Sequence, residues 1–295
     1  MAAQRTSNEG LRPPQNGQTD ARSRVEYDSA ALERLRHAAD LFQSLEREVD
    51  EWNRQNVLLA PTRRNASDPK ELEIFMPREP RLPLPRWSNS FGDGVHSLRA
   101  SLDRLAFELC HVTGQAPEKP TQIYFPVAEK PDQWRDKIKH LGSIPETILE
   151  RLKQVQPWHS AKPKTHALAL IHGLDILDKH RTKVDVFALP TGLSPERLRA
   201  WPGGEEHSDA WEEPWMQVEY DGPVGHGAEP ALWDVDAWPL VHFEGRMALL
   251  GQLQPWLYQE TMRIFLFVTS GKWPESSNPV PEPEWVALPP WGVQP

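Results

Sequence analysis

The sequence has little cysteine and no long apolar run. Cys110 is the single cysteine among 295 residues, which excludes an intrachain disulfide framework and any zinc module built from several cysteines. The longest strongly apolar run, Ile264 to Val268, is far too short to cross a bilayer. The first ten residues lack the apolar stretch of a secretory signal peptide. We therefore expect a cytoplasmic protein without a membrane partner.

The motifs of several enzyme classes are also missing. The sequence contains no G-x-S-x-G, no P-loop, no G-x-G-x-x-G and no H-E-x-x-H. It therefore gives no support to a serine hydrolase with a nucleophile elbow, an NTPase, a dinucleotide-binding enzyme or a zincin. From the sequence alone we expect no cofactor and no metal, and whether the chain is an enzyme stays open.

The charge is uneven along the chain. The net charge is −9, yet the stretch 205–245 holds 11 acidic residues and neither Lys nor Arg. The remainder is only mildly basic, so nucleic acid is an unlikely partner, although it is not excluded. A small ligand or a protein partner remains open.

Proline and tryptophan are abundant, with 30 and 13 residues. Residues 1–27 are polar and cannot offset their own ordering entropy, so we expect them to be disordered. We expect one α+β domain over 28–272, with an acidic, Trp-rich insert at about 191–245. The tail 273–295, with seven prolines and three tryptophans, should be extended and disordered rather than packed.

The hydrophobic periodicity predicts a helical core of about four longer helices, with short antiparallel strands on one side. Ser29 is a suitable N-cap for the first helix, and Pro255 should break or kink the last. The predicted helices are 29–55, 89–111, 165–181 and 246–268, and the predicted strands are 57–59, 71–76, 122–127, 184–189, 216–220 and 240–243.

A polar stripe borders the apolar face of the helix 89–111. His96, Arg99 and Asp103 fall within about 60° of one another on the helical wheel. One interpretation is a surface ion pair between Arg99 and Asp103, worth about 0.3–0.5 kcal/mol. The other is a partly desolvated site whose charges need partners from elsewhere in the fold.

The helix 165–181 is apolar on nearly every side, which is typical of a buried helix. Asp175 and Asp178 should therefore be buried carboxylates that need charged partners. Gly173, unfavourable inside a helix, indicates a close approach by another backbone or helix. His172, Asp175 and Asp178 are spaced so that only two of them could readily share one ion, and this favours no metal site.

We infer that these two helices pack together, so that His96 and Arg99 face Asp175 and Asp178. A buried ion-pair network without chemistry would explain the same residues. The candidate ligand-binding residues are His96, Arg99, Asp103, His172, Asp175, Asp178, His180 and Arg181.

Two segments carry a resemblance. His96-Ser-Leu-Arg-Ala-Ser-Leu-Asp-Arg-Leu-Ala106 and Leu174-Asp-Ile-Leu-Asp-Lys-His-Arg181 resemble a group of bacterial proteins common in actinobacteria, whose pattern is roughly ALHNLRxALDHLA followed by LHxLDxIDKHR. The likeness covers about residues 30–190, and the second motif is the more specific. The group usually has His where this chain has Arg104, which weakens any catalytic role for this position. The resemblance implies no activity.

Three functions stay open. The first is a binding protein with a polar site between the two motif helices. The second is a HEPN-like, metal-independent ribonuclease, because Arg104 and His111 have the R-x6-H spacing and would be its catalytic residues, although Leu105 stands where such enzymes usually have a polar residue. The third is a structural or interaction protein.

Overall fold

The chain was analysed as a computed structural model. The structure describes residues 29–56, 58–75, 82–114, 116–179, 186–191, 198–200, 214, 216–219, 231–275 and 279–287. The segment 1–27 that we predict to be disordered lies outside the described residues, as does most of the predicted acidic insert.

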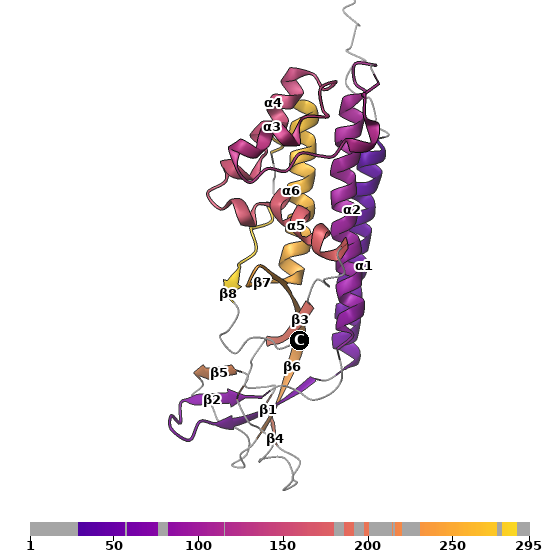
Figure 1. Ribbon diagram of the computed structural model, residues 1–295. Coiled ribbons are helices and arrows are strands. Elements are labelled where there is room, and N and C mark those ends of the chain that lie inside the picture. The colour runs from indigo at the N-terminus through magenta and orange to yellow at the C-terminus, as the bar shows by residue number, and fades with distance from the viewer. Residues whose placement is uncertain are drawn as a thin grey trace, which may run out of the picture.

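The fold is α+β with a helical core, as predicted. Figure 1 shows the long helices running together, with the strands gathered at one end of them. The α-helices are α1 (Ala30–Gln55), α2 (Leu84–Cys110), α3 (Trp134–Lys137), α4 (Glu146–Gln154), α5 (Ala167–Lys179) and α6 (Leu250–Ser270). The strands are β1 (Leu58–Arg64), β2 (Glu71–Ile74), β3 (Val186–Thr191), β4 (Leu198–Ala200), β5 (Met216–Glu219), β6 (Ala231–Phe243), β7 (Arg246–Leu249) and β8 (Val286–Ala287).

Helices α1 and α2 pack antiparallel, and the end of α2 caps the start of α1. Glu108 accepts hydrogen bonds from the Ser29 hydroxyl at 2.6 Å and from the Ala31 N–H at 3.1 Å. Ser29 also accepts from the Leu32 N–H, as its predicted N-cap role requires. A carboxylate at a helix N-terminus is favourable because it faces unsatisfied N–H groups and the positive end of the helix dipole.

The α1–α2 contact is close because a glycine makes room for an aromatic ring. A Cβ at Gly94 would lie 2.2 Å from the Phe42 ring, so only glycine admits this ring. Phe42 in turn stacks on Phe91, with ring centroids 6.0 Å apart. This packing fixes the face that α2 turns toward the rest of the molecule.

The long strand β6 connects the sheet to the helices. Its first half pairs with β1 and β4, and its second half pairs with β3 and β7, all antiparallel. At its middle, the Asn53 side chain on α1 donates to the Ala237 carbonyl at 2.9 Å and accepts from the Ala237 N–H at 3.0 Å. This pair of hydrogen bonds fixes the sheet relative to α1.

Helices α5 and α6 complete the core. The Phe243 ring of β6 lies against Gly173, where a Cβ would be 2.6 Å from the ring. The close approach to this glycine is thus made by a side chain from a strand, and not by the backbone or helix that we predicted. Helix α6 continues through Pro255 instead of ending there. Residues 246–249, predicted as helix, form β7, because Glu244 and Gly245 both have positive φ and turn the chain into a hairpin.

The segment 279–287 is extended, as predicted for the tail, but it also packs. Val280 and Trp285 are partly buried against the helical core, and β8 pairs with β7. Earlier in the tail, the Trp273 ring stacks on Phe267 with centroids 4.2 Å apart. The prediction of an unpacked tail is therefore wrong for these residues, since their aromatic groups find apolar surface on α6 and its neighbours.

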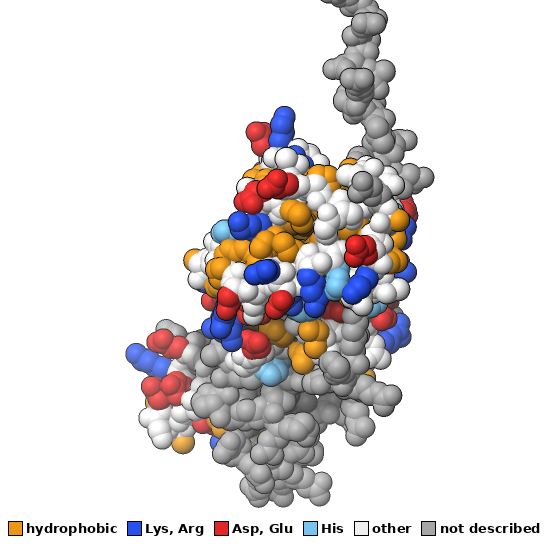
Figure 2. Space-filling model, turned by 45° about the horizontal axis from the view of Figure 1, so that its top comes forward, with side chains coloured by type: hydrophobic (Ala, Val, Ile, Leu, Met, Phe, Trp, Pro, Cys, Tyr) orange, Lys and Arg blue, Asp and Glu red, His pale blue; other side chains and the backbone are white. Residues whose placement is uncertain are grey.

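The surface carries charges of both signs. Figure 2 shows acidic and basic side chains interspersed over the helical part of the face in view, with His side chains among the Lys and Arg near its middle. Neither sign dominates this face. Any charge selectivity must therefore come from individual residues and their partners.

His166 holds the start of α5. Its Nδ1 accepts from the Leu168 N–H at 3.3 Å, and its carbonyl accepts from the Leu170 N–H at 3.0 Å. Nδ1 can accept only when it carries no proton. Burial lowers the pKa of His166 to about 4, which keeps the ring neutral and the helix cap intact.

This cap makes stability depend on pH. As the pH falls through about 6.5, the unfolded chain binds a proton at His166 while the folded chain does not until about pH 4. Over that window, we expect this histidine to lower the unfolding free energy of the protein by at most about 3 kcal/mol. His166→Asn keeps an acceptor without titrating and should flatten the profile in urea melts. The control His37→Asn, on the exposed face of α1, should keep the wild-type slope; equal slopes in all three proteins would contradict this role.

Candidate functional site

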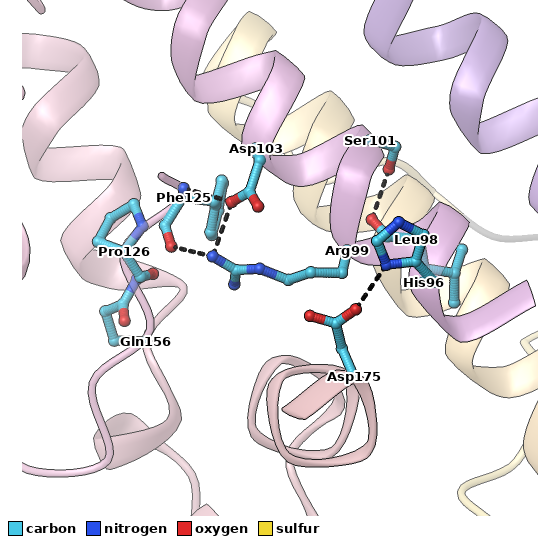
Figure 3. Close-up of polar contacts among 9 residues, drawn as sticks. All are labelled: His96, Leu98, Arg99, Ser101, Asp103, Phe125, Pro126, Gln156 and Asp175. Carbon is cyan, nitrogen blue, oxygen red and sulfur yellow. Dashed lines mark hydrogen bonds and ion pairs between the residues drawn. The ribbon is translucent and has the colours of Figure 1, made fainter. Parts of the chain in front are cut away.

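The two motif helices pack together, as predicted from their buried acids. His96 on α2 and Asp175 on α5 are joined by a contact of 2.7 Å between Nδ1 and Oδ1 (Figure 3). Asp175 is only 2% exposed, whereas the His96 side chain is half exposed. Because a carboxylate can only accept, Nδ1 is the donor in this contact.

Arg99 takes a different partner from the one that the packing argument predicts. Its Nη2 donates to Asp103 Oδ1 at 2.7 Å and to the Phe125 carbonyl at 3.0 Å. Of the two predicted partners, Asp175 is joined to His96, and the Asp178 side chain lies outside the described residues; the pair seen for Arg99 is the one within α2. This is not a solvent-exposed surface ion pair, however, because the Arg99 side chain is only 7% exposed.

A loop that was predicted as a strand faces these two helices. Residues 122–127 were predicted to pair in a sheet, but the backbone groups of Phe125 and Pro126 bond to side chains. The Phe125 N–H donates to Asp103 at 2.8 Å. The amide of Gln156, 1% exposed, accepts from the Ala128 N–H and donates to the Pro126 carbonyl.

Gln156 is a positioning residue that sequence reasoning missed. It lies just after α4, at the N-cap of a short helix, Pro157–His159, and nothing about a lone glutamine in the sequence marks it as buried. Its third bond, to the Leu152 carbonyl at 2.7 Å, fixes the amide orientation. The loop is therefore held from two sides, by Asp103 and by Gln156.

A cavity of about 340 Å³ opens between α2, α5 and this loop. We call it the α2–α5 cavity. Its walls include Arg99, Asp103, Tyr124, Phe125, Lys137, Lys139, His140, His172, Asp175 and Ile176. A second hollow of about 440 Å³ shares Lys139 and His140 with it and adds Glu118 and Lys119, so charged side chains of both signs continue along the rim.

Arg99 supplies the feature that marks this cavity. Its Nη1 is buried and has no hydrogen-bond partner among the residues that the structure describes. A buried donor left without an acceptor costs about 1–3 kcal/mol. In Figure 3 the guanidinium lies between the Phe125 segment and Asp175, where an incoming acceptor would complete its set of hydrogen bonds.

Other predicted residues are distributed differently. His172 lines the cavity and has a further interaction of its own. Asp178 lies in α5, but its side chain is outside the described part, and so are His180 and Arg181. Of the described candidates, Arg99, Asp103, His172 and Asp175 line this cavity, and His96 contacts it through Asp175.

The proposed ribonuclease pair lies elsewhere on α2. Arg104 pairs with Glu108 at 3.4 Å, the residue that caps α1. The His111 Nδ1 lies 2.8 Å from the Phe107 carbonyl, and the ring is exposed. Neither residue lines the α2–α5 cavity, and the contacts of both are those of helix ends.

No protein-family model, curated protein or solved structure matches this chain. Within the described ranges, no helix is long and apolar enough to span a membrane. In the same part of the chain, no group of three His, Cys, Asp or Glu side chains is arranged to hold a metal ion.

The buried pair leads to a stability prediction. Arg99→Ala leaves Asp103 without its cation and should lower the unfolding free energy by about 3 kcal/mol. Arg104→Ala, in an exposed pair on the same helix, should cost about 0.5 kcal/mol or less. The double change Arg99→Met with Asp103→Asn should recover part of the loss, because Asn still accepts from the Phe125 N–H and leaves no charge behind.

Urea melts of these variants measure their unfolding free energies and test this prediction. The Arg104 variant is the matched control, since it removes the same side chain from the exposed side of α2. Equal and small effects of the two alanine variants would mean that the Arg99 pair behaves as ordinary surface.

Proposed function

We propose that this protein binds a small anionic molecule in the α2–α5 cavity. The observation that carries the proposal is Arg99, a nearly buried guanidinium with one nitrogen that lacks an acceptor on the cavity wall. Carboxylate and phosphate oxygens are the acceptors that a guanidinium binds best. The ligand would supply that oxygen.

The charges around the cavity support an anion. Asp103 is paired with the Arg99 guanidinium, and Asp175 accepts a hydrogen bond from His96, so two of the acids on the wall already have partners. Lys137 and Lys139 lie at the rim without an ion pair among the described residues. Asp136 is the one acid of the wall without an ion pair in the described part of the chain. The two lysines outnumber it, so the unpaired charges of the wall are positive on balance and favour entry of an anion.

The size and chemistry of the cavity fit a small ligand. A volume of about 340 Å³ lies at the lower end of ligand pockets, which run from about 300 to 1,000 Å³. The exposed Tyr124 and Ile176 provide apolar contact beside the polar floor. The adjoining hollow with Lys119 gives a longer anion room to extend.

Titration with inorganic phosphate, pyrophosphate, acetate and succinate tests the proposal. We expect at least one of them to bind saturably in calorimetry and to raise the melting temperature. Arg99→Gln should weaken binding by about tenfold or more, the equivalent of about 1.4 kcal/mol. Lys137→Ala with Lys139→Ala should weaken it less and reduce its salt dependence.

Arg104→Gln is the matched control, because it removes a guanidinium from the same helix away from the cavity. It should bind as the wild type does. Absence of binding by all four anions at millimolar concentration would overturn the proposal, and so would unchanged affinity in a folded Arg99→Gln protein.

A further inference from the structure

A second cavity lies on another side of the helical core. It measures about 540 Å³ and is formed by α1, the middle of β6 and the first turn of α6. We call it the α1–α6 cavity. It shares no residue with the α2–α5 cavity, so what it binds is independent of the function proposed above.

Two acidic side chains on its wall lack cations. Glu46 and Asp50 stand one turn apart on α1, and neither has an ion pair in the part of the chain that the structure describes. The basic residue beside them, Arg54, is already paired with Glu51 at 2.6 Å. Like charges at this spacing repel each other, so a cation placed between them would be held by both.

An aromatic ring is part of the same wall. Trp238 on β6 is 45% exposed, although tryptophan is normally one of the most buried residues on average. Indole is the best aromatic partner for an organic cation. Val49 and Leu249 add apolar surface next to the ring.

A buried amide provides the independent observation. Gln254 on α6 is only 3% exposed, and its Nε2 has no hydrogen-bond partner among the described residues. It lines the α1–α6 cavity and also a smaller hollow of about 230 Å³ that continues it between α1 and α6. Close by, no side chain caps the first N–H groups of α6. Both features call for an oxygen acceptor.

We propose that the α1–α6 cavity is a second binding site, for a small organic cation that carries an oxygen acceptor. Glu46 and Asp50 hold the ammonium group against the Trp238 ring. Gln254 donates to the oxygen a few atoms away. The two acids exceed the partial positive charge of the α6 N-terminus, so the ligand carries a net positive charge.

Choline is a suitable probe, because it joins a quaternary ammonium to a hydroxyl group. We expect saturable binding by calorimetry at constant ionic strength, and binding of its uncharged isostere neohexyl alcohol should be about tenfold weaker or more. Glu46→Gln with Asp50→Asn should weaken choline binding by a similar factor. Trp238→Leu should also weaken it. Asp40→Asn, an exposed acid on the same helix without an ion pair among the described residues, is the matched control and should change nothing.

The role of Gln254 has its own readout. Wild-type protein should bind choline more tightly than tetramethylammonium, and Gln254→Leu should bind the two equally. These variants are expected to fold, since Glu46 and Asp50 are exposed and removal of an unpaired buried amide relieves a cost. No choline binding, equal binding of neohexyl alcohol, or full affinity in the folded Glu46/Asp50 double variant would each overturn the proposal.

Discussion

The α2–α5 cavity depends on the hydrogen bonds that the Asp103 carboxylate accepts. One of its oxygens takes both the Arg99 guanidinium, at 2.7 Å, and the Phe125 N–H, at 2.8 Å. Arg99 also donates to the Phe125 carbonyl. The loop is thereby bound at both backbone groups of one residue by two side chains of α2. Residues 123–128 belong to neither a sheet nor a helix, so side chains must satisfy the backbone groups of this wall.

The same arrangement leaves one nitrogen of Arg99, Nη1, without a hydrogen-bond acceptor among the described residues. A guanidinium has five N–H donors in a fixed plane, and the helix and loop engage only one edge of it. Because Asp175 is joined to His96, that carboxylate is directed partly away from Arg99. Because Asp103 and Asp175 have separate partners, Arg99 keeps an available donor in a nearly buried site.

The sequence was sufficient to predict the helices and the contact of α2 with α5, but not the partners within that contact. Apolar periodicity defines a stripe, and two acids in an apolar helix must meet cations. The pattern does not say which cation, because His96 and Arg99 lie on the same stripe and a small rotation of α2 exchanges them. Residues 122–127 were predicted as a strand because their side-chain partners, Asp103 and Gln156, are far away in the sequence. No local pattern shows that these side chains, and not a neighbouring strand, bond to the segment.

The strand β7 was missed for a different reason. Its apolar residues merge with those of α6, and periodicity alone cannot separate a short strand from the helix that follows. The Glu244–Gly245 turn was a local signal that could have divided them, since two residues with positive φ suit a tight hairpin. The packed segment 279–287 was missed because the sequence shows only composition there, while its binding surface is built by α6.

The buried donors without acceptors differ in what surrounds them. Trp87 and Trp285 also have an indole N–H without a partner among the described residues, yet neither lines either cavity. The donors of Arg99 and Gln254, in contrast, each belong to a residue that lines a cavity. An unmet donor costs about 1–3 kcal/mol, a sizeable part of a typical domain's stability of about 5–15 kcal/mol. A ligand that meets either donor removes that cost in the folded state alone, so binding and folding are thermodynamically linked at both sites.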